Sequence, residues 1–168
     1  SRGLVGSEMC IRDSCNADYV ILPGVGSAQM VMQSLISNNL VNVIKSLTQP
    51  VLGICVGMQI LFNSSEEQNC KCLGLINDDI KKFNLPKDKA VPHMGWNKVI
   101  FESEQLLSNY YYFANSYYAP ITKDTTGICE YGIEFSATVQ KDNFFGCQFH
   151  PEKSSNSGIK FIQNFLNY

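Results

Sequence analysis

The stretch PVLGICVGMQILF (50–62) is the most informative part of the chain, because an apolar run passes directly into a segment with helical spacing. Its first five residues predict a buried strand, and its last seven predict a helix that begins just after Cys55. A strand that turns tightly into a helix holds its turn residue out of the sheet, and glycines at neighbouring positions relieve the crowding. Gly53 and Gly57 stand at those positions. The stretch therefore predicts a strand–turn–helix unit with a cysteine at the turn.

The residues on both sides of this unit predict an α/β fold. Upstream, YVIL (19–22) predicts a short strand, PGVGS (23–27) predicts a turn, and apolar residues at helical spacing continue to Leu47. Asn38 and Asn39 weaken the middle of that helix and favour a split into two. Downstream, the patterns predict closely spaced strands over residues 97–101, 111–118, 126–131, 135–140 and 144–149. A final helix is predicted over residues 159–166. This order predicts a sheet that is parallel in its centre with antiparallel additions.

Composition narrows the class of protein. A length of 168 residues with 45% hydrophobic residues suits one globular domain. The net charge is -2, and no basic stripe with interleaved aromatic residues follows the chain, which argues against a nucleic-acid partner. No apolar run has the length of a membrane span, and the start lacks a signal-peptide pattern. We therefore expect a cytoplasmic protein with no membrane partner.

The seven cysteines are odd in number and irregularly spaced, so they form no disulfide framework. The CKC stretch (70–72) has no second ligand pair at zinc spacing, and we expect neither a metal nor a cofactor. The first residues, SRGLVGSEMCIRDS (1–14), show neither strand nor helix period and resemble translated sequencing-adapter read-through. A disordered leader is the alternative. In both cases the expected domain covers residues 15–168.

Cys55 is the candidate nucleophile. The start of a helix directs free N–H groups and the positive end of the helix dipole at the thiol, and we expect them to lower its pKa and favour the thiolate. The N–H of Val56 is then free to stabilise an oxyanion. The alternative is that Cys55 is an inert buried cysteine.

A nucleophilic thiol needs a base, and the chain has two histidines, His93 and His150. His150 follows the predicted strand 144–149 and stands two residues before Glu152, so in extended geometry the two side chains point the same way. Glu152 can then hold the imidazole tautomer, as the third member of a triad does. His93 has no carboxylate nearby in sequence and is expected to be structural or at an interface. A strand-end histidine beside a solvated glutamate is the alternative for His150.

The turn LPGVGS (22–27) follows the earlier predicted strand. If the two early strands are neighbours, this turn lies at the carboxyl edge of the sheet, beside the thiol, and its backbone can supply a second oxyanion donor. The alternative is a plain strand-to-helix turn.

Five stretches together resemble the glutaminase subunit of imidazole glycerol phosphate synthase, in the class I glutamine amidotransferase family of histidine biosynthesis. They are ADYVILPGVG, PVLGICVGMQILFNSSEE, VPHMGWNKV, YYFANSYY and FFGCQFHPEKS. The motifs GICVGMQ and QFHPEK mark the broad class, and PGVG and PHMGWN narrow it to this subunit. The resemblance runs from about Ala17 to the C-terminus. It implies a flavodoxin-like amidotransferase sheet that lacks its usual N-terminal strand and helix.

The resemblance implies a Cys55, His150 and Glu152 triad that hydrolyses L-glutamine through a cysteine thioester and releases ammonia. It places the oxyanion at the backbone of Val56 and Val25. It also implies a set of glutamine-binding residues, namely Gly26, Gln59, Glu67, Ser116 and Tyr117. Each of these has a plainer alternative as a solvated or loop residue.

The resemblance further implies a heterodimer with a cyclase subunit that has a β/α barrel and uses the ammonia to make imidazole glycerol phosphate. Trp96, Asn97 and Lys153 resemble contacts to that barrel, although an ordinary core position is the alternative for the tryptophan. The chain departs from the family pattern at Asn115, where the subunit commonly has histidine. A hydrolase without a synthase partner, an amidotransferase of another pathway such as surface-sugar amidation, and an inactive fragment of poor stability remain open.

Overall fold

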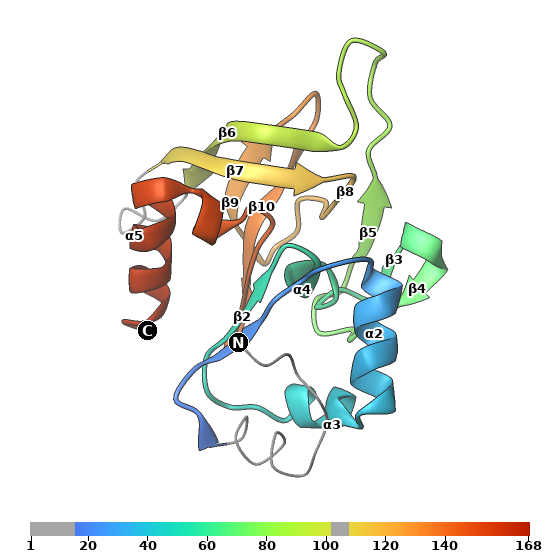
Figure 1. The fold of residues 1–168 in the computed structure, drawn as a ribbon, viewed down its shortest axis with the longest axis vertical. Coiled ribbons are helices and arrows are strands. Elements are labelled where there is room, and N and C mark those ends of the chain that lie inside the picture. The colour runs from blue at the N-terminus through green and yellow to red at the C-terminus, as the bar shows by residue number, and fades with distance from the viewer. Residues whose placement is uncertain (1–15, 102–107) are drawn as a thin grey trace.

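A computed structural model describes residues 16–101 and 108–168 (Figure 1). The leader expected at residues 1–14 lies outside the described residues. The helices and 3-10 turns are α2 (Ala28–Ser37), α3 (Leu40–Lys45), α4 (Val56–Gln59), η1 (Glu67–Asn69), η2 (Pro151–Lys153) and α5 (Ser155–Phe165). The strands are β1 (Val20–Leu22), β2 (Val51–Ile54), β3 (Ser64–Ser65), β4 (Cys70–Lys71), β5 (Asp79–Lys82), β6 (His93–Phe101), β7 (Asn109–Asn115), β8 (Tyr117–Tyr118), β9 (Thr125–Glu130), β10 (Glu134–Lys141) and β11 (Phe144–Cys147).

The main sheet has the strand order β1-β2-β11-β10-β9-β6-β7. β2 pairs in parallel with β1 and with β11, whereas the pairs from β11 through β10, β9 and β6 to β7 are antiparallel. An α/β fold with a mixed sheet is therefore confirmed. The parallel strands stand at one end of the described order and not at its centre, because the antiparallel strands extend the sheet on one side only.

β2 separates two hydrophobic cores. Val51 packs in the core that contains α2, α3 and α4, and Leu52 packs in the core that contains α5, and neither side chain is exposed. Figure 1 shows α2 and α5 on opposite sides of β2. A parallel strand that is buried on both faces must be apolar throughout, which explains the continuous run found in the sequence.

Several boundaries differ from those expected. The helix split is confirmed at Asn38 and Asn39, where Asn39 has φ 56. α4 ends at Gln59, three residues earlier than predicted. The expected strand 111–118 is interrupted at Ser116, which separates β7 from β8.

A small second sheet, in the order β4-β3-β5-β8, was not predicted from the sequence. Its strands are two to four residues long; β8 falls within the expected strand 111–118, whereas β3, β4 and β5 show no apolar or alternating run. Across the described ranges, the structure contains no helix with both the length and the apolar character to cross a bilayer.

Candidate active site

Cys55 occupies a sharp turn between β2 and α4, with φ 54 and ψ -111, a conformation that residues other than glycine seldom adopt. The backbone packs closely around it. A Cβ placed on Gly57 would collide with the carbonyl oxygen of Leu22, and one placed on Gly24 would collide with the backbone nitrogen of Gly57. The turn after β1 therefore lies directly against the first turn of α4, beside the cysteine, as the sequence predicts for adjacent strands.

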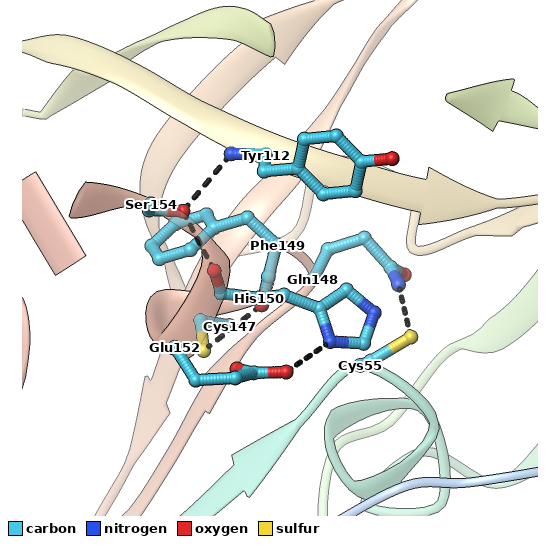
Figure 2. A network of polar contacts seen from close by, with 8 residues as sticks. All are labelled: Cys55, Tyr112, Cys147, Gln148, Phe149, His150, Glu152 and Ser154. Carbon is cyan, nitrogen blue, oxygen red and sulfur yellow. Dashed lines mark hydrogen bonds and ion pairs between the residues drawn. The ribbon is translucent and has the colours of Figure 1, made fainter. Parts of the chain in front are cut away.

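The imidazole of His150 lies between Cys55 and Glu152 (Figure 2). Its Nδ1 is 2.8 Å from Oε1 of Glu152, and the edge of the ring with the other nitrogen faces the sulfur of Cys55. The imidazole is 15% exposed and the glutamate side chain 58% exposed. Because a carboxylate accepts at Nδ1, that nitrogen carries the proton and Nε2 is left as the base.

The backbone around His150 differs from the extended geometry expected. β11 ends at Cys147, and residues 151–153 form the 3-10 turn η2, so the contact between His150 and Glu152 closes across a turn. Two further bonds hold His150. Its N–H donates to the carbonyl of Tyr112 at 2.8 Å, and the hydroxyl of Ser154 donates to its carbonyl at 2.7 Å.

Gln148 contacts the cysteine and was not predicted from the sequence. Its side chain is fully buried, and Nε2 lies 3.7 Å from the sulfur of Cys55 (Figure 2). Its Oε1 accepts a hydrogen bond of 2.9 Å from Gln59. The available signal was the two-residue spacing from Gln148 to His150, which favours the same side of an extended segment.

Burial raises the pKa of Cys55 to about 11. The backbone hydrogen bond from Val56 lowers this pKa, the charges of Glu152 and Glu67 raise it, and the hydrogen bond from Gln148 lowers it. The expected net lowering is wrong, because desolvation of the thiolate outweighs the donors at the start of α4. The thiol is therefore protonated at neutral pH and needs the adjacent imidazole to remove its proton.

The turn that contains Val25 and Gly26 lies near Glu67. Oε2 of Glu67 accepts a 2.8 Å hydrogen bond from the N–H of Ala28, at the start of α2. Val25 is 87% exposed, and Gly26 has φ +95, in the region that favours glycine. These residues lie at the same edge of the sheet as Cys55, while the roles expected for them stay predictions.

Of the remaining candidate glutamine-binding residues, Ser116 and Tyr117 lie beside and in β8, and Gln59 is the last residue of α4. The carbonyl of Tyr117 accepts from Gln59 at 3.1 Å and from Asn115 at 2.9 Å. The carbonyl of Ser116 accepts from the N–H of Phe83 at 3.0 Å. The amide of Gln59 is thus engaged within the protein, and its side chain is only 3% exposed.

Two of the three candidate interface residues form a surface cluster with Tyr112. Trp96 is 52% exposed, so the alternative of a core position for it is wrong. Its ring packs edge-on against the ring of Tyr112, with 6.2 Å between the ring centroids. The ammonium of Lys153 lies 5.7 Å from the centroid of the same ring. Asn97 instead donates to the carbonyl of Glu130 at 2.8 Å.

His93 and the other thiols lie outside the candidate site. His93 is 3% exposed and is stacked between Tyr131 and Phe113, which confirms a structural position. All the cysteines within the described ranges are free and buried. Those ranges also contain no group of three His, Cys, Asp or Glu side chains that could hold a metal ion.

The family model and the similar proteins that match this chain all belong to the glutamine amidotransferases. Residues 8–167 match the family model described as glutamine amidotransferase class-I. The imidazole glycerol phosphate synthase subunit HisH of Shewanella sediminis is 46% identical over 160 residues, which are 89% of this chain and 73% of that protein. The HisH subunit of Escherichia coli K12 is 47% identical over 160 residues, which are 89% of this chain and 80% of that protein.

Solved structures agree at the level of the fold. A crystal structure of a glutamine amidotransferase aligns with a TM-score of 0.72 and 13% identity, over 97% of this chain and 83% of that one. A glutamine amidotransferase from Thermotoga maritima aligns with a TM-score of 0.57 and 17% identity, over 89% of this chain and 63% of that one. At such identities the likeness concerns the fold alone.

Proposed function

Because this chain belongs to the class I glutamine amidotransferases, and within them to the HisH subunits of imidazole glycerol phosphate synthase, we propose that it hydrolyses glutamine and delivers ammonia for histidine biosynthesis. The observation that carries this proposal is the placement of the His150 imidazole between the Glu152 carboxylate and the Cys55 sulfur (Figure 2). A thiol, a base and a residue that orients the base are the parts that nucleophilic acyl transfer needs.

In the proposed reaction, Nε2 of His150 takes the proton of the Cys55 thiol as the sulfur attacks the side-chain amide carbon of glutamine. The N–H of Val56 stabilises the oxyanion, together with the backbone at Val25. His150 then returns its proton to the leaving nitrogen, which departs as ammonia and leaves a glutamyl thioester. Water, deprotonated by His150, hydrolyses the thioester to glutamate and restores the thiol. Glu152 keeps the imidazole in the tautomer that these steps require.

A partner is part of the proposal. Ammonia in water at neutral pH is mostly ammonium, which is not a nucleophile, so the product must pass directly to an acceptor site. We propose a cyclase subunit with a β/α barrel as that partner, in a cytoplasmic heterodimer. The exposed Trp96 with Tyr112 and Lys153 is the proposed contact cluster, since tryptophan and tyrosine are enriched among the residues that dominate binding at interface centres.

The first test measures glutamine turnover by the full chain, alone and with the ligand-bound cyclase partner. We expect turnover to rise when the partner is added and to fall at least about 10³-fold in Cys55→Ala. A glutamine-like diazoketone should label Cys55 alone. Cys129→Ala is the matched control, because Cys129 is also a buried free cysteine and is expected to keep its activity.

The proposal fails if Cys55→Ala retains wild-type turnover. Turnover that ignores the ligand-bound cyclase partner would instead indicate a hydrolase without a synthase partner.

A further inference from the structure

We propose that Gln148 positions and activates the nucleophile by holding an amide N–H donor against the sulfur of Cys55 as its negative charge develops. This role rests on the proposed function, in which Cys55 attacks glutamine. The contact joins residues 93 positions apart, with 3.7 Å between Nε2 and the sulfur.

The contacts around Gln148 determine which end of its amide faces the sulfur. A backbone carbonyl can only accept, so the atom of Gln59 that lies 3.1 Å from the carbonyl oxygen of Tyr117 is the nitrogen. That nitrogen also lies 2.9 Å from Gln148, so the atom of Gln148 facing it must be the acceptor Oε1. Nε2, the donor, is therefore the end of Gln148 that faces Cys55.

A third residue completes this arrangement. Nδ2 of Asn115 donates to the carbonyl of Tyr117 at 2.9 Å, so both acceptor positions of that oxygen are filled. Gln148, Gln59 and Asn115 are 0%, 3% and 4% exposed, so little water competes for these bonds. Gln148 is anchored through its backbone as well, because its own N–H donates to the carbonyl of Ala137 at 2.8 Å. The donor is thus held in place before the reaction begins.

Such a donor discriminates between the states of the sulfur. A neutral thiol or a thioester sulfur is a weak acceptor, whereas a thiolate is a strong one, so the N–H stabilises the charged form selectively. Burial and the charges of Glu152 and Glu67 work against the thiolate at this site. The bond from Gln148 therefore offsets part of the cost of moving the proton from Cys55 to His150.

The test replaces Gln148 in the full chain and measures the thiol directly. Gln148→Met keeps the length but removes the donor, and Gln148→Glu keeps the acceptor for Gln59 but places a carboxylate oxygen at the sulfur. The rate at which iodoacetamide alkylates Cys55, followed from about pH 6 to pH 11, reports the fraction of thiolate. With the cyclase partner present, kcat and KM for glutamine are measured for the same variants.

We expect alkylation of Cys55 at pH 8 to fall about 3- to 10-fold in Gln148→Met and further in Gln148→Glu, with the rise of the alkylation rate displaced to higher pH in both variants. kcat should fall by about 10-fold while KM changes by less than about threefold, because the bond strengthens only as charge develops. The control is Gln163→Met, because Gln163 is an exposed glutamine of α5. Its alkylation profile, kcat and KM should match those of the wild type.

Wild-type alkylation profiles in folded Gln148→Met and Gln148→Glu overturn the role of Gln148. If Gln148→Met does not fold, Gln148→Glu, which keeps the bond to Gln59, carries the test alone. A wild-type chain without glutaminase activity, whose alkylation profile still shifts in these variants, supports the contact and contradicts the proposed function.

Discussion

Glu152 acts on Cys55 and on His150 in opposite directions. It holds Nδ1 of His150 at 2.8 Å, which leaves Nε2 as the base, and its negative charge raises the pKa of Cys55. The first effect favours proton transfer during turnover, and the second makes the resting thiol less acidic. A substitution that removes the charge of Glu152 but keeps the shape of its side chain should therefore separate its effect on His150 from its effect on the pKa of Cys55.

For Glu152→Gln we expect kcat for glutamine to fall about 10- to 100-fold, since a charge-assisted hydrogen bond that orients the base is lost. Alkylation of Cys55 by iodoacetamide at fixed pH should instead rise slightly, because a charge that raises its pKa is gone. Steady-state kinetics and mass spectrometry measure the two effects.

Glu130→Gln, in an exposed glutamate of β9, is the matched control and should change neither rate. A Glu152→Gln variant in which turnover and alkylation fall together would contradict a tautomer-holding role for Glu152.

Local patterns revealed some of these residues and not others. Cys55, His150 and Glu152 were predictable because each stands at a position where strand, turn and residue type coincide. Gln148 was not predicted, because its partners Cys55 and Gln59 come from a distant part of the chain. The direction of the Cys55 pKa shift was predicted wrongly, because burial depends on the side chains packed around the sulfur.

Among the elements of the fold, η2 and α5 position His150 and Glu152. A Cβ placed on Gly158 would collide with the carbonyl oxygen of Pro151, so α5 lies directly against the backbone of η2. The hydroxyl of Ser154 ties the same turn to β7, since it donates to the carbonyl of His150 and accepts from the N–H of Tyr112.

Gly158→Ala should therefore push α5 away from η2 and displace the triad. We expect the free energy of unfolding to fall by about 1 to 3 kcal/mol, as is typical of overpacked substitutions. The loss can be larger here, because the atom that the new methyl group meets belongs to the backbone of Pro151. Turnover should also fall in the fraction that remains folded. Urea unfolding curves and kcat at a temperature well below the melting transition measure the two effects.

Asn156→Ala is the control for this helix, because Asn156 is exposed on α5 and alanine favours a helix. It should leave stability and kcat close to those of the wild type. Equal stabilities for Gly158→Ala and Asn156→Ala would show that α5 adjusts without cost.

Elements with an apolar or alternating pattern were predictable, the three-residue β1 included, and elements without one, such as β5, were not. β2, β6, β9 and β10 carry apolar or alternating patterns over four or more residues, whereas β3 and β4 have two residues each. The order of the strands in the sheet also could not be predicted from local sequence patterns. β11 is the last strand in the chain, yet it pairs with β2.

For the molecule as a whole, His93 links stability to pH. Burial lowers its pKa to about 4 from a usual value of 6.5, and the charge of Lys89 adds to this lowering. The ring is stacked at 3.9 Å between centroids on Tyr131 and at 4.9 Å on Phe113. The unfolded chain binds a proton at this histidine below about pH 6.5, whereas the folded chain binds one only below about pH 4.

The stability that His93 contributes is therefore fully present above pH 6.5 and is lost as the pH falls from 6.5 toward 4. Between pH 7.5 and pH 5.0 we expect this residue to lower the free energy of unfolding by at most about 2 kcal/mol. His93→Phe keeps the stacked ring without a titrating group, so its stability should depend less on pH. Urea unfolding at both pH values measures the difference.

His150→Asn is the matched control, because it removes the other histidine and leaves His93 in place. The pH dependence that this variant retains is the part carried by groups other than His150. A His93→Phe variant with the same loss of stability between the two pH values would assign that loss to other groups.

The order of residues along the chain was enough to predict the class of fold and to single out Cys55, His150 and Glu152, which the structure brings together. Apolar periodicity, the glycines around Cys55 and the short spacing from His150 to Glu152 are local features, and local backbone preferences act through them. The five quoted stretches carried the family resemblance that the comparisons support.

The contacts that support Cys55, His150 and Glu152 became visible only in three dimensions. The joining of β11 to β2 brings Gln148 to the sulfur of Cys55, and the carbonyl of Tyr117 orients the glutamine amides. The same packing buries the thiol and raises its pKa to about 11. Desolvation and long-range hydrogen bonds depend on which segments meet, and the spacing of residues along the chain does not encode that meeting.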